Sequence, residues 1–196
     1  MTGNGGLQMG AGNGGPVMEV NKAAGRSLRM TAGDIIILTG VSGVGKSTLA
    51  ARLAADLKAP FIDGDDHHLP ASIAKMAQGI ALGDADRWPW LEAVAAAANA
   101  AAAGGGVVIA CSALKRIYRD HLAEGCLTPP IFIHLHAPRH VVAGRLAARA
   151  HHFFDASLLD SQMDILEMPG HDEIYRLIDA SGGIDSVYRA IRTALS

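Results

Sequence analysis

The feature that most constrains this chain is a glycine-rich turn between a short apolar run and an amphipathic segment. Residues 40–47 read Gly-Val-Ser-Gly-Val-Gly-Lys-Ser, which matches the pattern G-x-x-x-x-G-K-S/T in full. The run 35–38 is typical of a strand buried on both faces, and residues 46–58 place leucines on one face of a helix. A loop in this position binds phosphate through backbone N–H groups at the positive end of the helix dipole. The sequence therefore predicts a nucleotide phosphate site on an α/β scaffold.

The motif also predicts a role for its polar residues. Lys46 is expected to reach the β- and γ-phosphates, and the Ser47 hydroxyl to ligate Mg²⁺. The glycines let the backbone curl so that several N–H groups point at one anion. The residues predicted to bind the nucleotide are Gly40, Ser42, Gly43, Val44, Gly45, Lys46, Ser47 and Thr48.

The rest of the chain alternates strand and helix patterns, which favours a parallel sheet with helices on both faces. Strands are expected near 35–38, 60–62, 107–111, 131–135 and 174–179. Helices are expected near 46–58, 70–78, from 84 or 86 to the glycines at 104–106, 114–124, 138–149, 156–167 and 184–195. The predicted fold class is thus α/β, with a five-stranded parallel sheet and a small lid over about 145–157.

The N-terminal segment differs in composition from the rest of the chain. Residues 1–33 hold no aromatic side chain and many glycines, so they cannot bury enough apolar surface to offset their ordering entropy. We expect them to form a disordered arm or a non-native extension, and residues 34–196 to form the folded domain. No secretory signal is visible, and the uncharged stretch 93–114 is interpreted as a helix and a buried strand rather than a membrane span.

Charge and cysteine usage exclude further classes. A formal net charge of −2 argues against a nucleic-acid partner. The two cysteines, Cys111 and Cys126, are too few for a disulfide framework, so a reducing, cytoplasmic compartment is expected.

The phosphate-binding loop alone does not separate a small-molecule kinase from a GTPase or an ATPase motor. None of the lysines stands in an N-K-x-D or T-K-x-D element of the kind that reads guanine. Motors generally need a longer chain. A chain of 196 residues with a fifth strand near its end suits a nucleoside-monophosphate-kinase-like architecture.

An acidic turn, Asp63-Gly64-Asp65-Asp66-His67-His68, comes directly after the second expected strand. Ligands of open parallel sheets bind beyond the carboxyl ends of the strands, so these carboxylates belong at the edge of the phosphate site. Phosphoryl transfer to an alcohol needs a proton acceptor, and Mg²⁺ needs oxygen partners. We predict that Asp65 orients and deprotonates the acceptor hydroxyl, and that Asp63 supports Mg²⁺ through water. The alternative is a solvated acidic turn.

Two arginines, Arg145 and Arg149, are four residues apart and share one face of an expected helix. In a small kinase this is where a lid would bring arginines onto the transferring phosphoryl group. We therefore predict that both are catalytic. The alternative is a solvated basic face.

Several blocks occur together between residues 34 and 180. They are Asp63-Gly64-Asp65-Asp66 with His68, Lys75-Met76 and Gly79; Asp84-x-Asp86-Arg87-x-Pro89-Trp90-Leu91; Cys111-Ser112-Ala113-Leu114-Lys115-Arg116-x-Tyr118-Arg119-Asp120; and His152-Phe153 with Leu158-Leu159-x-Ser161-Gln162 and Leu166-Glu167-x-Pro169. In order and spacing this set resembles the gluconokinases of the P-loop carbohydrate kinase type.

That resemblance implies ATP-dependent phosphorylation of D-gluconate to 6-phosphogluconate, with Mg²⁺ and a homodimer. An anionic acceptor needs a cation for its carboxylate, for which Arg87, Lys115 and Arg119 are the candidates; surface ion pairing is the alternative for each. The predicted substrate-binding residues are Asp65, His68, Arg87, Lys115, Arg119 and Gln162.

The chain departs from the family pattern at Leu69, where proline is usual, and at Ser72, where asparagine is usual. It also has Ala150-His151 where a Lys-Gly pair is common. Other interpretations remain open at this point. They are another small-acceptor kinase, similar to a shikimate or adenylylsulfate kinase, and a nucleotide-binding regulatory module without a metabolic acceptor.

Overall fold

Five parallel strands form one sheet in the order β2-β3-β1-β4-β5, in a computed structural model that describes residues 30–148 and 156–196. The strands are β1 (Ile35–Thr39), β2 (Phe61–Asp63), β3 (Val107–Ala110), β4 (Ile131–His136) and β5 (Tyr175–Asp179). The predicted five-stranded parallel sheet is confirmed, and each expected strand lies within a residue or two of its observed position.

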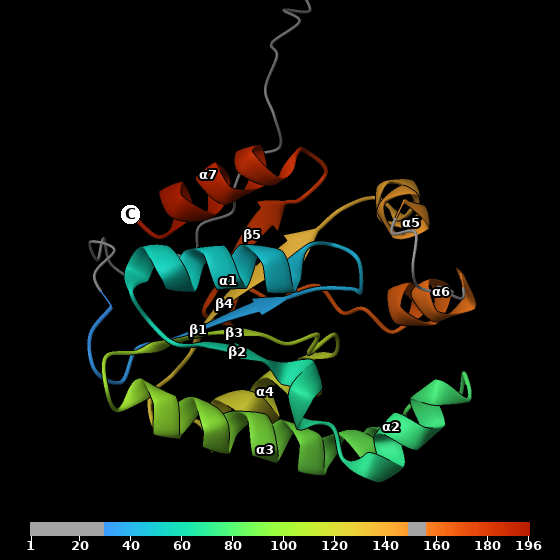
Figure 1. Ribbon diagram of the computed structural model, residues 1–196, viewed down its shortest axis with the longest axis horizontal. Helices are drawn as coiled ribbons and strands as arrows, with labels where there is room; N and C mark the ends of the chain where they lie inside the picture. The colour runs from blue at the N-terminus through green and yellow to red at the C-terminus, as the bar shows by residue number, and fades with distance from the viewer. Residues whose placement is uncertain (1–29, 149–155) are drawn as a thin grey trace, which may run out of the picture.

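Helices cover both faces of this sheet (Figure 1). On one face lie α1 (Lys46–Leu57) and α7 (Ile184–Ala194), and on the other lie α3 (Asp84–Ala102) and α4 (Arg116–Gly125). Because side chains alternate along a strand, β1 supplies Ile36 and Leu38 to the core under α1, and Ile35 and Ile37 to the core under α3. The apolar run 35–38 of β1 is therefore buried on both faces, as its sequence predicts.

The remaining short elements gather at the end to which the strands point (Figure 1). They are the 3₁₀ turn η1 (Gly64–His67), α2 (Pro70–Ala77), α5 (Arg139–Ala147) and α6 (Ala156–Asp164). Helix α6 ends three residues before its predicted limit of 167, because the Glu167 N–H donates to Leu114 O (2.9 Å) and so leaves the helix. This edge of the sheet is where α/β folds build their sites.

At the start of the described chain, Met30 packs against the core and the Gly33 N–H donates to Ala102 O (2.9 Å). Residues 30–33 thus lie against the domain, whereas residues 1–29 of the expected arm lie outside the described residues. In the two described stretches, no helix combines the length and hydropathy that crossing a bilayer requires.

A buried histidine supports the strand that leads into the phosphate-binding loop. His134 in β4 is fully buried, and its Nδ1 shares a hydrogen bond with the Thr39 hydroxyl (2.9 Å). Burial, aided by the positive charge of Arg119, lowers the pKa of His134 from 6.5 to about 3. In the folded protein the imidazole therefore stays neutral as the pH falls from 6.5 toward 3, whereas in the unfolded chain it becomes protonated over this range.

This difference predicts acid sensitivity. The unfolded chain binds a proton at His134 below pH 6.5 and the folded protein does not, so the stabilisation is complete above pH 6.5 and is lost as the pH falls toward 3. The loss should approach about 1.4 kcal/mol per pH unit. In His134→Gln, urea unfolding between pH 6 and 4 should show a smaller slope of stability against pH. An unchanged slope would contradict the assignment.

Candidate active site

The phosphate-binding loop joins β1 to α1, as predicted. Its glycines Gly40, Gly43 and Gly45 have φ angles of 133°, 81° and 112°, a region that side chains other than glycine rarely adopt. A Cβ on Gly40 would lie 2.5 Å from Leu135 O, and one on Gly43 would lie 2.5 Å from Leu146 Cγ. Both the backbone path and the close packing therefore require glycine here.

The start of α1 is prepared to receive an anion. Gly45, its N-cap, offers no side-chain cap, and the first turn of α1 contains no acidic residue. The N–H groups of that turn and the positive end of the dipole are therefore not compensated by a carboxylate of the helix itself. Ser47 and Thr48 are exposed at this end, and Lys46 turns back over the loop so that its Nζ donates to Val41 O (3.1 Å).

The acidic turn lies at the end of β2, where hydrogen bonds and close packing hold its backbone in place. Asp63 caps η1, because its Oδ1 accepts from the Asp65 N–H (3.2 Å). The buried Trp90 donates its indole N–H to Gly64 O (2.7 Å), and a Cβ on Gly64 would lie 2.8 Å from Ala110 O. The turn therefore has no room for a larger residue at 64, and it leaves Asp65 exposed.

The buried thiol of Cys111 lies just beyond β3, and its pKa reflects the charged groups near this edge of the sheet. Burial, together with the charges of Asp65 and Asp63, raises the pKa of Cys111 to about 12, and the charge of Lys46 opposes this shift. All three charges thus act on one point at the end of β3. Lys46, Asp63 and Asp65 therefore all lie within electrostatic range of this thiol.

His68 and Arg87 border the acidic turn. The His68 ring stacks on Trp90, with centroids 4.4 Å apart and planes 15° apart. Burial lowers the pKa of His68, Asp65 opposes this shift and Arg87 adds to it, so the imidazole is neutral at pH 7. Three buried side-chain atoms among the described residues have no hydrogen-bond partner; two of them, His68 Nδ1 and Arg87 Nε, lie here, and the third is His134 Nε2.

The other cations of this region are paired. Lys115 contacts Asp84 (2.7 Å), which also accepts from the Tyr118 hydroxyl, and these contacts lower the pKa of the Asp84 carboxyl. Lys75 contacts Asp86 in the same way, at 2.6 Å. Arg87 instead donates to the Leu82 carbonyl (3.2 Å) and forms no ion pair within the described part of the chain. Of the predicted carboxylate ligands, Arg87 is therefore the one that forms no ion pair among the described residues, although its charge acts on Asp84 and Asp86.

Arg119 does not reach the site. It is 1% exposed, and its guanidinium forms a fork on both carboxylate oxygens of Glu173. Its Nη1 also donates to the carbonyls of Ala113, Leu114 and Glu167. The prediction that Arg119 binds the substrate is corrected on this geometry, because its donors are consumed inside the protein. It holds the loop that carries Lys115.

Glu173 completes this buried pair. Its own burial would raise the pKa of its carboxyl, but hydrogen bonds from Arg119 and from the Gly170 N–H outweigh burial and place the pKa below its usual value. The carboxylate is thus ionised, and the two charges compensate each other. The sequence gives no sign of this contact, because the partners are 54 residues apart.

Two further predicted residues, Arg145 on α5 and Gln162 on α6, contact the phosphate-binding loop. Arg145 donates to Val44 O (3.2 Å) and to Gly182 O (2.6 Å). Gln162 on α6 contacts Ser42, a partner 120 residues away that sequence reasoning missed. Arg149, together with the part of the expected lid at 149–155, lies outside the described residues.

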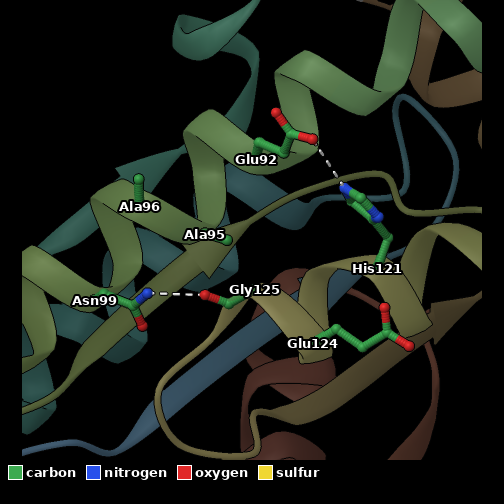
Figure 2. Close-up of a pocket in the computed structure, with 7 residues that line it drawn as sticks. All are labelled: Glu92, Ala95, Ala96, Asn99, His121, Glu124 and Gly125. Carbon is green, nitrogen blue, oxygen red and sulfur yellow. Dashed lines mark hydrogen bonds and ion pairs between the residues drawn. The ribbon is translucent and has the colours of Figure 1, made fainter.

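A second hollow lies between α3 and α4 (Figure 2). Glu92 faces His121 across it at 3.7 Å, and Asn99 donates to Gly125 O at 2.9 Å. None of the residues that line it belongs to the loops at the carboxyl ends of the strands. It is separate from the phosphate site.

The sheet order, the glycine loop and the uncompensated helix start define a P-loop kinase. A family model described as an AAA domain matches residues 35–169. The thermosensitive gluconokinase of Escherichia coli K12 is 42% identical over 168 residues, covering 84% of this chain and 88% of that protein. The chain belongs to the gluconokinase family.

Two further comparisons agree with this placement. The thermoresistant gluconokinase of Escherichia coli K12 is 47% identical over 141 residues, covering 71% of this chain and 79% of that protein. The crystal structure of a gluconokinase from Sinorhizobium meliloti 1021 is 39% identical, with a TM-score of 0.76 over 85% of this chain and 93% of that one. A shikimate kinase from Bacteroides thetaiotaomicron shares the fold, with a TM-score of 0.60 at 19% identity.

The buried position of Arg119 predicts a stability effect that the surface pairs should not show. Arg119→Met should lower the free energy of unfolding by about 3–5 kcal/mol, because it leaves the Glu173 carboxylate buried without its partner. The measurement is urea unfolding at pH 7. Arg116→Met is the matched control on the same helix, since its contacts to Asp172 are exposed, and its loss should be much smaller. Equal losses would contradict the structural role of Arg119.

Proposed function

We propose that this chain transfers the γ-phosphoryl group of ATP to the 6-hydroxyl of D-gluconate, giving ADP and 6-phosphogluconate. One observation carries the proposal: an exposed carboxylate, Asp65, and an arginine that forms no ion pair among the described residues, Arg87, border the same turn beside the phosphate-binding loop. The names of the relatives, gluconokinases of bacterial origin, support the acceptor. The geometry favours an acceptor that carries both a hydroxyl and an anionic group.

The nucleotide side of the reaction depends on positioning and charge. Backbone N–H groups of residues 43–48 would hold the phosphates, and Lys46 would stabilise the negative charge of the transferring group. Arg145 lies against the same loop, through Val44, and adds positive charge to that side. Thr48 stands exposed at the start of α1, where the dipole favours phosphate.

On the acceptor side, Asp65 orients the 6-hydroxyl for attack. The hydroxyl oxygen bonds to the γ-phosphorus, the bond from that phosphorus to the β–γ bridging oxygen breaks, and ADP leaves. In a loose transition state the proton departs late and passes to the Asp65 carboxylate. The neutral His68, stacked on Trp90, would form an adjacent wall that hydrogen-bonds the polyol.

Mg²⁺ is implied by the family, and the residues present fit it. The Ser47 hydroxyl at the start of α1 and the Asp63 carboxylate at the end of β2 are hard oxygen donors, the type that Mg²⁺ prefers beside phosphate oxygens and water. Ser47 would hold the ion directly and Asp63 through water. When bound, the ion neutralises charge on the β- and γ-phosphates.

Compartment, assembly and domain extent complete the proposal. Both thiols, Cys111 and Cys126, are free, which supports a reducing, cytoplasmic compartment. The resemblance to gluconokinases supports a homodimer. We propose residues 34–196 as a single kinase domain.

The acceptor is tested by coupled ADP release with gluconate, glucose, shikimate and adenylylsulfate, with Lys46→Ala as the inactive control. Gluconate should be strongly preferred over glucose, because the neutral sugar leaves Arg87 without a partner. Comparable kcat/KM for both sugars would refute the carboxylate site. Turnover of shikimate or adenylylsulfate alone would identify another small-acceptor kinase.

The carboxylate ligand is tested by Arg87→Met. It should lower kcat/KM for gluconate about 10- to 100-fold, because one charged hydrogen-bonding partner is lost, and leave the KM of ATP unchanged. Arg189→Met, an exposed arginine on α7, serves as the matched control and should change neither constant. A larger loss from Lys115→Met than from Arg87→Met would assign the carboxylate to Lys115 instead.

The two acidic residues should separate by kinetics. Asp65→Asn should lower kcat by about 10²- to 10⁴-fold, the range for loss of a general base, with little change in ATP affinity. Asp63→Asn should instead raise the Mg²⁺ concentration needed for half-maximal rate. If Asp65→Asn weakened nucleotide binding and Asp63→Asn reduced only kcat, the two roles would be exchanged.

A further inference from the structure

One peptide group in the phosphate-binding loop is held at both ends by side chains, one from the adjoining start of α1 and one from the distant α6. The carbonyl of Val41 accepts from the Lys46 Nζ (3.1 Å), and the N–H of Ser42, which belongs to the same peptide group, donates to Gln162 Oε1 (2.7 Å). The Gln162 amide also donates through Nε2 to the Ser42 hydroxyl (3.1 Å). Gln162 thus forms a two-point contact that orients its own amide.

The peptide group transmits this orientation. It is planar and trans, so its C=O and N–H point in opposite directions and cannot turn independently. When Gln162 fixes the N–H of Ser42, it also fixes the direction of the Val41 carbonyl that receives the Lys46 ammonium. The position of the lysine that carries the reaction is therefore connected to a residue on α6 through one rigid plane.

Helix α6 is itself anchored without the help of the loop. Arg139 on α5 contacts Asp160 with both Nε and Nη2, at 2.5 and 2.8 Å. Leu159 is buried in the core, and the Glu167 N–H just after α6 is held by Leu114 O (2.9 Å). Gln162 therefore starts from a fixed helix, as a positioning group must.

We propose that Gln162 is a positioning residue that sets Lys46 for phosphoryl transfer through the Val41–Ser42 peptide group. The proposal deepens the proposed function and rests on it only through the role of Lys46 toward the nucleotide. It replaces the prediction that Gln162 binds the acceptor, because the amide is engaged with Ser42. A misplacement of about 1 Å at a reacting group costs about 100-fold in rate, so an indirect contact of this kind matters.

The test compares Gln162→Met and Gln162→Asn with Ser161→Ala, the adjacent residue on α6 whose hydroxyl donates within the helix to Leu158 O. Methionine keeps the volume of the side chain and loses both contacts; asparagine keeps the amide but is too short to reach Ser42. The measurements are kcat, the KM of each substrate, the melting temperature, and the Kd of an imido analogue of ATP with Mg²⁺. Each Gln162 variant is also made in the Lys46→Ala background for the binding measurement.

Both Gln162 variants should lower kcat about 10- to 100-fold and weaken binding of the analogue, with the KM of gluconate unchanged. In the Lys46→Ala background they should weaken the analogue no further, because the group that they position is gone. Ser161→Ala should behave as the unaltered protein. Asparagine keeps the site polar, so Gln162→Asn can still be compared with Ser161→Ala if Gln162→Met does not fold.

Three results would overturn the proposal. They are an unchanged kcat in both Gln162 variants, equal losses of binding with and without Lys46, and a raised KM of gluconate with unchanged analogue binding. The last result would return Gln162 to the acceptor site. Absence of turnover with gluconate in the unaltered protein would refute the acceptor alone, because the binding cycle needs no acceptor.

Discussion

The buried fork between Arg119 and Glu173 is the contact on which the catalytic edge depends. One guanidinium binds a carboxylate before β5 and carbonyls in two other segments, the loop after β3 at 113–114 and the segment after α6 at 167. The first of these leads to Lys115 and the start of α4, and the second follows α6, the helix that reaches the phosphate-binding loop. Burying the Arg119 charge costs free energy, but the guanidinium connects three irregular segments that no strand pairing holds in place.

Around this centre the charges divide into paired and unpaired groups. On the acceptor side, Asp84 and Asp86 each form an ion pair with one lysine, whereas Arg87 forms no ion pair among the described residues. On the nucleotide side, the first turn of α1 contains no acidic residue. Positive potential is thus available at Arg87 for the acceptor carboxylate and at the start of α1 for the nucleotide phosphates. The neighbouring lysines form ion pairs that stabilise the fold.

The sequence predicts the sheet and the loop well because their signals are local. A wholly apolar run marks β1, and the spacing of glycines with Lys46 and Ser47 marks the loop that must come after it. It predicts that the acidic turn and the phosphate-binding loop share one edge of the sheet because parallel strands end there. It fails where function depends on long-range contacts. Nothing adjacent to Arg119 distinguishes it from the other cations, and the partner of Gln162 is 120 residues away.

The thiol at the end of β3 has a consequence for chemical durability. Cys111 is 1% exposed, and its pKa of about 12 keeps it protonated in neutral solution. Peroxides and alkylating agents attack the thiolate, so this sulfur is inert although it lies among the charges of the site. The protein can therefore keep a compact, polarisable group behind its reacting residues without making this position sensitive to oxidants.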